Sequence, residues 1–393
     1  MTDLEWLMRL LALMVVALPA ASLASLGLLA QAGTKPSERL VTRLVQPATV
    51  LALLSGIGAA GLMAWLGNAC FEAHLAEWVH MPGYDFKLRL EFDRLSITFA
   101  ILSLALAAVI GSFSSRYMHR EPGFTRYFLL YAVFVLGMAT AALSANIETL
   151  IIGWELVGLS SALLIGFFHE RPGPSRNGFW VWTVYRLADA GLLLAAVLLH
   201  HSAGHGDFHA LLGGPWPGGS MKELPPAMVA AGFLILLAAA GKSGLVPFSG
   251  WVPRAMEGPT PSSAVFYGAL SVHLGAYLLL RVEPLLECSP ALEALVVAVG
   301  LTTSAFAYLA GSVQTDIKSA LSFASLSQVG LIVAEVGLGF RYLALVHLLG
   351  HACLRTLQFL RAPTLLQDYH TIENAIGDRL PRKPTPWARL SAG

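Results

Sequence analysis

Residues 227–244 read AMVAAGFLILLAAAGKSG, a run of apolar and small residues in which Lys242 is the one ionisable side chain. A helix needs about 20 such residues to cross a hydrocarbon core about 30 Å thick. The next segment, LVPFSGWVP over residues 245–253, carries Pro247 and Pro253, and proline interrupts a helix. Broken helices at membrane depth usually line a polar cavity. This stretch therefore predicts a discontinuous membrane-spanning helix with a charged residue at its break.

The whole sequence has the composition of a membrane protein. Of its 393 residues, 56% are hydrophobic and 12% are charged, whereas soluble domains carry about 25% charged residues. Apolar runs of spanning length recur between polar breaks and predict about eleven helices. We expect their centres near residues 17, 55, 101, 134, 157, 190, 235, 271, 300, 328 and 351. Because open sheets cannot satisfy their backbone groups in lipid, the sequence predicts an all-α polytopic bundle over residues 1–366 and a polar tail over residues 367–393.

Basic residues in the short loops predict the orientation of the bundle, because cytoplasmic loops carry an excess of Lys and Arg. Alternate loops are richer in them: Lys35, Arg39, Arg43, Arg116, Arg120, Arg126, Arg171, Arg176, Arg254, Lys318 and the basic tail. With an odd number of spans, this pattern places the N-terminus outside a bacterial inner membrane and the C-terminus in the cytoplasm. The run from Trp6 to Ala30 is too long for the core of a signal peptide and is expected to be the first span. Residues 368–376 predict either a short interfacial helix that contacts a partner or a disordered segment.

Several classes of bound group are not indicated. Cys70, Cys288 and Cys353 lie far apart and form no C-x-x-C pair, so no iron–sulfur cluster, haem attachment or structural zinc is expected in this chain. The string GKS at residues 241–243 lacks the glycine that a phosphate-binding loop needs five residues earlier, where Leu236 stands. The formal net charge of +1, with basic residues dispersed between apolar runs, does not indicate nucleic-acid binding.

Glu155 and Lys242 are the first candidates for a functional role. An ionisable side chain at membrane depth costs about 2.5–3.5 kcal/mol on insertion scales, so each one is a functional candidate. Glu155 lies within IIGWELVGLSSALLIGFF, residues 151–168. Burial weakens the hold of a lysine on its proton and a nearby carboxylate strengthens it, so moving one charge changes the other's proton affinity. We expect the two to form a proton switch; the alternatives are a structural carboxylate and a lysine that reaches the membrane interface.

Two further segments can approach this pair. Arg186 and Asp189 in WTVYRLADAGLLL are three residues apart on one helical face, which predicts a local ion pair that reaches Glu155 or Lys242 or is satisfied by itself. In QTDIKSALSFASLSQVG, residues 314–330, Ser and Gln follow a short turn. This segment either lines a hydrated path or packs through its small residues.

Histidines at membrane depth are candidates for proton relay, because imidazole titrates near neutral pH. His273 lies in FYGALSVHLGAYLLL, and His347 and His351 are four residues apart on one predicted helical face. The alternative for each is an interhelical hydrogen-bond donor. Four more histidines cluster in HHSAGHGDFH, residues 200–209, where we favour a solvated loop over a metal site because matching ligands are not evident nearby.

Four strings in order along the chain resemble the antiporter-like subunits of respiratory complex I and the Mrp antiporters. They are WELVGLSSALLIGF, GKSGLVPFSGWVPRAMEGPTPSSA, QTDIKSALSFASLSQVG and HLLGHACLRTLQFL, and the resemblance covers residues 90–362. It implies a proton-conducting membrane subunit. Glu155 matches the family's glutamate on the fifth core helix, and Lys242 matches its central lysine on the broken helix. His347 and His351 match the histidines that link toward the next half-channel in the family. Arg186 and Asp189 match an Arg and an Asp that the family carries on one helix.

The sequence departs from the complex I pattern at three places. Tyr267 stands where those subunits typically have a His, which appears instead at His273, and Arg355 stands where a Lys often follows the later histidines. The sequence also ends before the second broken helix and lateral helix that the largest complex I subunit carries. A second half-channel is therefore not expected within these residues.

The strings over residues 266–281 and 355–377 most resemble DabB, the membrane-subunit family of the DAB-type inorganic carbon uptake systems. This resemblance implies a cytoplasmic partner, the DabA-like zinc protein akin to a β-carbonic anhydrase. The chain would pass H+ or Na+ down its gradient and drive one-way CO2 hydration by the partner, without being an enzyme itself. The alternatives are a subunit of a complex I, hydrogenase or Mrp-type complex, and a scaffold that anchors a catalytic partner.

Overall fold

The computed structural model describes residues 3–81, 84–219, 226–362, 372 and 375–377 of the chain. Two units are distinguished, Met1–Leu360 and Arg361–Gly393. Within the described residues, 11 helices are long and apolar enough to cross a membrane, and each predicted centre falls inside one of them. The predicted all-α polytopic fold is confirmed. The predicted helix at residues 368–376 lies largely outside the described residues.

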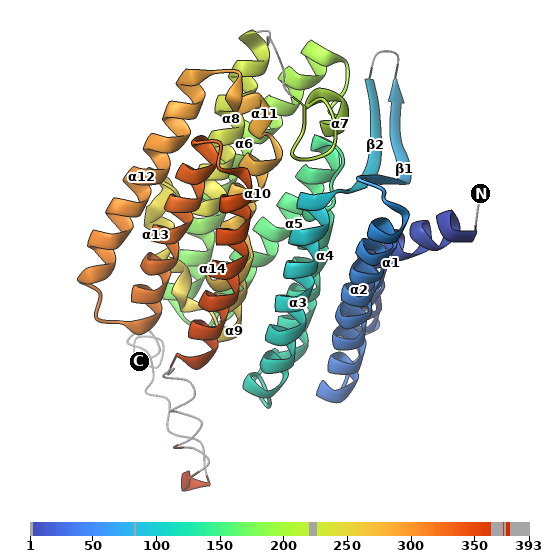
Figure 1. Ribbon diagram of the computed structural model, residues 1–393. Helices are drawn as coiled ribbons and strands as arrows, with labels where there is room; N and C mark the ends of the chain where they lie inside the picture. The colour runs from blue at the N-terminus through green and yellow to red at the C-terminus, as the bar shows by residue number, and fades with distance from the viewer. Residues whose placement is uncertain (1–2, 82–83, 220–225, 363–371, 373–374, 378–393) are drawn as a thin grey trace. The chain divides into compact units, whose positions relative to one another are not determined.

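Most of the main helices are joined by short connections, and longer segments follow residues 66, 203 and 243 (Figure 1). The main helices are α1 (Asp3–Gln31), α2 (Glu38–Leu66), α3 (Arg94–Tyr117), α4 (Phe124–Ala142), α5 (Ile147–Ile165), α6 (Pro172–Ala203), α8 (Pro226–Ser243), α10 (Ser271–Arg281), α12 (Pro290–Ser312), α13 (Ile317–Gly337) and α14 (Arg341–Arg361). The short elements are α7 (Phe208–Leu211), α9 (Thr260–Ser263), α11 (Glu283–Glu287), the 3-10 helices η1 (Phe248–Trp251) and η2 (Pro253–Glu257), and the π-helix η3 (Ala264–Ala269).

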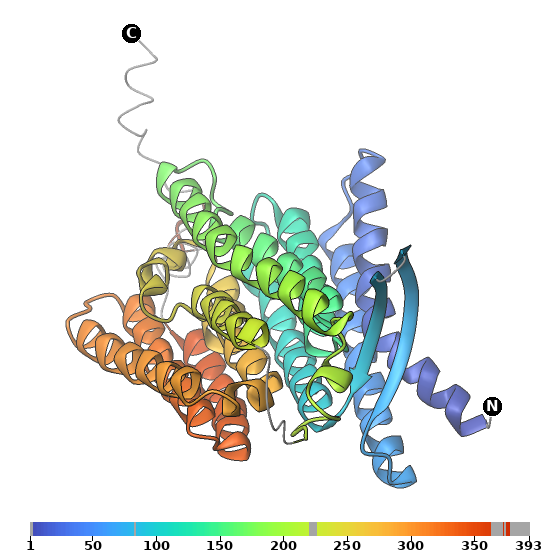
Figure 2. The same cartoon turned by 90° about the horizontal axis from the view of Figure 1, so that it is seen from above.

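Helix α8 buries its last turn, which carries Lys242, inside the bundle. It packs against α6 on one side and α10 on the other, and α10 in turn packs against α13. Seen from above, α1 and α2 lie on one flank and α12 and α13 on the opposite flank (Figure 2). Every residue of α10 and the last turn of α8 are therefore shielded by neighbouring helices, whereas α8 exposes one face that carries Phe233 and Leu237.

The predicted break after Lys242 is present. Helix α8 ends at Ser243, and Gly244 has a φ of +68° that L side chains rarely adopt. The break leaves backbone groups that need partners at membrane depth. The Trp251 indole donates to the carbonyl of Gly241 at 3.0 Å, and the amide of Val246 donates to Thr303 Oγ1 at 3.0 Å. The chain can therefore leave the helix here without unpaired backbone groups at these two positions.

One element was not anticipated from the sequence. Strands β1 (Phe71–Met81) and β2 (Tyr84–Phe92) form an antiparallel hairpin between α2 and α3. Its base is held by the bundle, because the Glu91 amide donates to the carbonyl of Leu143 at 2.7 Å. The hairpin, α7 and the start of α3 lie at the same end of the bundle (Figure 1), which we name the hairpin end. Because this sheet lies outside the spanning helices, the rule against open sheets in lipid does not forbid it.

Candidate functional site

Three helices bring four charged side chains into one continuous array. Glu155 comes from α5, Arg186 and Asp189 from α6, and Lys242 from the last turn of α8. Arg186 Nη2 donates to the Glu155 carboxylate and, at 2.8 Å, to Asp189 Oδ2. The same Asp189 oxygen lies 4.0 Å from Lys242 Nζ. The charges therefore alternate in the order Glu155, Arg186, Asp189, Lys242.

Lys242 is fully buried, with 0% of its side chain exposed. Its ammonium donates to the carbonyl of Trp154 at 3.0 Å and lies 4.5 Å from the Tyr185 ring centre and 4.9 Å from that of Trp154. A Cβ at Gly158 would lie 2.9 Å from Nζ, so only glycine leaves room for the ammonium here. Helix α5 thus forms part of the lysine's pocket.

Glu155 and Lys242, which we expected to pair, do not form an ion pair with each other and are connected through Arg186 and Asp189. Among the ion pairs of the described residues, the carboxylate beside Lys242 is Asp189, and Glu155 is connected to it through Arg186. Trp154 Nε1 donates to Asp189 Oδ1 at 2.6 Å, which orients this carboxylate. The reason is helical geometry: Trp154 and Gly158, four apart, turn toward Lys242, whereas Glu155 turns toward Arg186.

The array has a buried and a partly exposed half. Asp189 and Lys242 expose 3% and 0% of their side chains, and Glu155 and Arg186 expose 28% and 36%. Each half contains one cation and one anion. Charge interactions are stronger in the protein interior than in water. A change of charge at Glu155 or Arg186 is therefore felt at the buried pair.

A second cluster contains the three predicted histidines. His273 on α10 is fully buried, and its Nε2 lies 2.8 Å from Nδ1 of His351 on α14. Arg355 Nε donates to His351 Nε2 at 3.5 Å, which favours the His351 tautomer with its proton on Nδ1, the nitrogen that faces His273. His347 and His351 have ring centres 6.4 Å apart. The structure therefore brings the three imidazoles into one row.

The row of histidines ends at polar groups of α13. His347 Nδ1 lies 2.9 Å from Glu335 Oε1, and its Nε2 lies 3.0 Å from Gln328 Oε1. Glu335 was missed in the sequence analysis, although it stands in the apolar run LIVAEVG. The rule that selected Glu155, a carboxylate inside an apolar run, would also have selected it.

A short polar connection joins the two clusters. Ser243, next to Lys242, donates to the carbonyl of Val272, next to His273, at 2.6 Å. The hydroxyls of Tyr185 and Ser271 are buried and near each other, and neither forms a hydrogen bond of good geometry with a further described residue. Buried hydroxyls of this kind are positions where ordered water binds. The two clusters are thus adjacent through α8 and α10.

Other sequence predictions have mixed outcomes. His200 is buried against Glu148 rather than solvated, so the solvated-loop interpretation is wrong for this residue. No group of three or more His, Cys, Asp or Glu suited to a metal occurs in the described part of the chain. Lys318 donates to the carbonyls of Met256 and Gly258 at 2.8 and 3.1 Å and so fastens α13 to the segment after the break. The side chain of Tyr267 lies outside the described residues.

Comparison with known proteins gives two family matches. Residues 144–380 match the family "NADH:quinone oxidoreductase/Mrp antiporter, TM", and residues 78–128 match "NADH-Ubiquinone oxidoreductase (complex I), chain 5 N-terminus". NADH-quinone oxidoreductase subunit L of Mycobacterium tuberculosis is 33% identical over 80% of this chain and 50% of its own length. A protein of Halothiobacillus neapolitanus named probable inorganic carbon transporter subunit DabB1 is 33% identical over 70% of this chain and 49% of its own length.

Solved structures give the same fold. The Mrp complex of Dietzia contains a chain that matches 98% of this one with a TM-score of 0.74 and 26% identity, over 40% of that chain. An archaeal membrane-bound sulfane sulfur reductase matches with a TM-score of 0.76 at 19% identity, a likeness of fold. The chain spans about half the length of the curated relatives it matches. The sequence, the fold and the family match together show that the chain is a multi-pass membrane protein that belongs to the antiporter-like, ion-conducting membrane subunits of the complex I and Mrp type.

Proposed function

We propose that the chain conducts protons and couples their gradient to inorganic carbon uptake by a DabA-like, zinc-containing, carbonic-anhydrase-like partner. The observation that carries the conducting role is the buried ammonium of Lys242, 4.0 Å from Asp189 and connected through Arg186 to Glu155. Packing alone does not explain a charged pair this deep in a bundle, because replacing such a pair with apolar residues of similar volume is often neutral or stabilising.

The proposed switch acts through the alternating charges. When Glu155 is ionised, Arg186 is held between two carboxylates, and Asp189 shares its charge between Arg186 and Lys242. When Glu155 takes up a proton, Arg186 moves toward Asp189, which then offers less charge to Lys242. The ammonium holds its proton less firmly in that state, because an opposite charge nearby is what favours it. Proton uptake at one end thereby releases a proton at the other.

The proposed route from Lys242 continues along the polar groups of α10 and α14. Water bound at the Tyr185 and Ser271 hydroxyls would carry the proton to His273. From there the row His351, His347 would take it toward Glu335. Because the two nitrogens of His347 face Glu335 and Gln328, the step from His351 to His347 needs the His347 ring to reorient or a water between the rings.

The carbon-uptake role rests on resemblance to the DabB1 relative at 33% identity. A subunit L relative is equally similar at 33% identity. The second candidate is therefore a proton-translocating subunit of a complex I, hydrogenase or Mrp-type assembly. A large zinc protein that purifies with the chain would favour the first, and redox subunits or Na+-dependent flux would favour the second.

We propose a bacterial inner-membrane location with the N-terminus outside and the C-terminus in the cytoplasm. The supporting observation is that the loops and helix ends opposite the hairpin end carry Arg116, Arg120, Arg126, Arg171 and Lys318. The hairpin end would then face outward.

Reconstitution with the co-purified partner tests the proposal. Proteoliposomes should show proton flux that requires the partner and CO2 or bicarbonate, and Glu155→Gln and Lys242→Ala should abolish both flux and carbon-dependent growth. A scaffold would show no flux, and both variants would then grow normally.

A further inference from the structure

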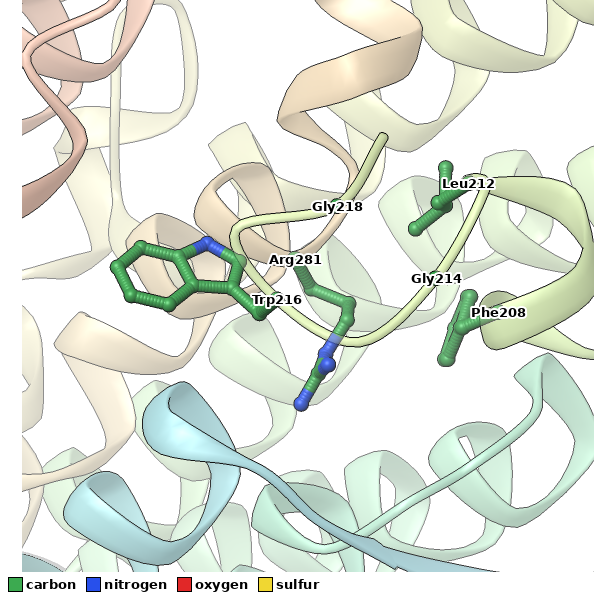
Figure 3. A pocket seen from close by; sticks show the side chains of 6 residues that line it. All are labelled: Phe208, Leu212, Gly214, Trp216, Gly218 and Arg281. Atoms are coloured by element: carbon green, nitrogen blue, oxygen red, sulfur yellow. The ribbon is translucent and has the colours of Figure 1, made fainter. Parts of the chain in front are cut away.

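The hairpin end contains a buried charge cluster separate from the array around Lys242. Glu91, the penultimate residue of β2, and Asp93, the N-cap of α3, both face Arg281 at the end of α10. The three side chains are 1%, 0% and 3% exposed, respectively. Figure 3 shows the Arg281 guanidinium beneath the loop of Trp216 and Gly218 and pointing toward the segment that joins β2 to α3.

The two carboxylates have unequal hydrogen bonding. Asp93 accepts from Leu95, Ser96 and Trp216 backbone amides at 2.8–3.1 Å and from both terminal nitrogens of Arg281 at 2.5 and 3.1 Å. Burial acts to raise the pKa of Asp93, but Arg281 and the backbone donors outweigh it and lower the pKa below its ordinary value. Asp93 is therefore held as the anion and takes up most of the guanidinium's charge.

Fewer hydrogen bonds and weaker contact with Arg281 stabilise the ionised form of Glu91. Its Oε1 accepts a weak bond from the Cys70 thiol at 3.6 Å, and its Oε2, which no described hydrogen-bond donor reaches, lies 3.9 Å from Arg281 Nη1. Burial is the main cause that raises the pKa of Glu91 to about 7, and Arg281 opposes it only in part. The thiol of Cys70, whose own pKa is raised by burial and by Glu91, keeps its proton.

The surroundings add negative charge. Glu72 on β1 and Asp93 both act on Glu91, whereas Arg281 and Tyr277 face the cluster from α10. Arg89 on β2 is occupied by Glu72 and Asp207. Four carboxylates, Glu72, Glu91, Asp93 and Asp207, therefore share two guanidiniums, Arg89 and Arg281. One proton on Glu91 relieves part of this excess, because like charges in one site favour protonation of the weakest-held member.

Helix α10 connects this cluster with the histidines. His273, Tyr277 and Arg281 are spaced by four residues and so follow one face of the helix. The span from His273 to Arg281 is about 12 Å at about 1.5 Å per residue. Tyr277 lies between them: Arg281 Nη2 donates to its hydroxyl at 3.4 Å, and the hydroxyl donates to the carbonyl of Ala142 at 2.6 Å.

We propose that Glu91, with Asp93 and Arg281, is a proton-binding site that exchanges protons between the His273–His351 pair and the hairpin side of the membrane. This inference rests on the proposed proton conduction for its role in transport, although proton binding by Glu91 can be measured without transport. Loading Glu91 frees Arg281 to bind Asp93 alone, and loss of the proton draws Arg281 back toward Glu91. Cys70, which contacts Glu91 and is only partly buried, would be the point of access from the aqueous side.

Two measurements on the intact complex test the site. Infrared titration should show a protonated-carboxyl C=O band with a midpoint near pH 7 that is absent in Glu91→Gln and retained in Glu77→Gln, a control at an exposed carboxylate of the same hairpin. In proteoliposomes, Glu91→Gln should lower flux about tenfold and flatten its dependence on hairpin-side pH, and Glu91→Asp should restore both in part.

The outcomes separate this inference from the proposed function. If the band is unchanged in Glu91→Gln, Glu91 binds no proton near neutral pH and the site is wrong, whether or not the complex conducts. If Lys242→Ala stops flux but Glu91→Gln leaves rate and pH profile unchanged, conduction stands and the exchange role is overturned. If the wild-type complex shows the band but no flux, proton binding stands, and both the exchange role and the proposed function fail.

Discussion

Asp189 Oδ2 lies 4.0 Å from the ammonium nitrogen of Lys242, and both side chains are buried. This carboxylate, rather than Glu155, is the immediate counter-ion of the lysine. It also holds Arg186 at 2.8 Å and so joins the buried lysine to the partly exposed half of the array. The consequences for function and stability differ from those of a direct Glu155–Lys242 pair.

Asp189→Asn should impair conduction, as Glu155→Gln does, and should lower folding stability more than Glu155→Gln does. It leaves Lys242 buried without an adjacent anion, and breaking a buried pair in this way costs about 3–5 kcal/mol. We expect at least about a tenfold loss of flux and a lower unfolding midpoint in detergent. Asp189→Glu should recover part of the flux. Equal effects of Asp189→Asn and Glu155→Gln on stability would argue against Asp189 as the counter-ion.

The pair should behave as a coupled unit. Lys242→Met alone leaves Asp189 with excess charge, and Asp189→Asn alone leaves Lys242 unpaired, whereas the double variant leaves neither. The double variant should therefore be more stable than the sum of the single losses predicts, by about 1–3 kcal/mol of coupling energy. Chemical unfolding of the four proteins in the same detergent measures it. Additive losses would mean that the two side chains do not interact.

Gly158→Ala should displace Lys242 without removing any charge. The new Cβ would lie 2.9 Å from Nζ and would compete with the bond from Nζ to the carbonyl of Trp154. Flux should fall several-fold while the protein remains folded. Gly61→Ala on α2 is the matched control, because nothing lies within 4 Å of its added Cβ. Wild-type flux in Gly158→Ala would show that the position of the ammonium is not critical.

The sequence was sufficient to predict the spanning helices but not which side chain contacts each buried charge. Apolar runs mark each span, and Lys242, Pro247 and Pro253 mark the break. Three-residue spacing also indicated the contact between Arg186 and Asp189. The side chain that faces Lys242 depends on the rotation of α5 against α6 and α8, which local pattern does not determine. The Arg281–Asp93 contact joins residues 188 positions apart and likewise depends on packing.

The pH dependence of stability offers a check on Glu91. Its pKa is raised above the ordinary value of 4.5 to about 7, so the folded protein binds this proton more tightly than the unfolded chain does. The contribution to stability is fully present below about pH 4.5 and is lost as pH rises through about 7. Glu91→Gln should remove this part of the slope between about pH 4.5 and 7 in thermal unfolding. An unchanged slope would contradict the assigned environment.

The histidine row should be required for flux but not for folding. His351→Gln breaks the bond of 2.8 Å with His273, and Glu335→Gln removes the partner of His347. Each should lower flux about tenfold or more with little loss of secondary structure. His209→Gln, in α7 at the hairpin end, is the control. Normal flux in both row variants would exclude the proposed route through α14.

Proton flux through the chain reconstituted with its co-purified partner is the most direct measurement. We predict flux in the wild-type complex that is lost in Lys242→Ala and Asp189→Asn, with correctly folded protein in each case. Undiminished flux in both variants would contradict the view that the buried Asp189–Lys242 pair moves the proton.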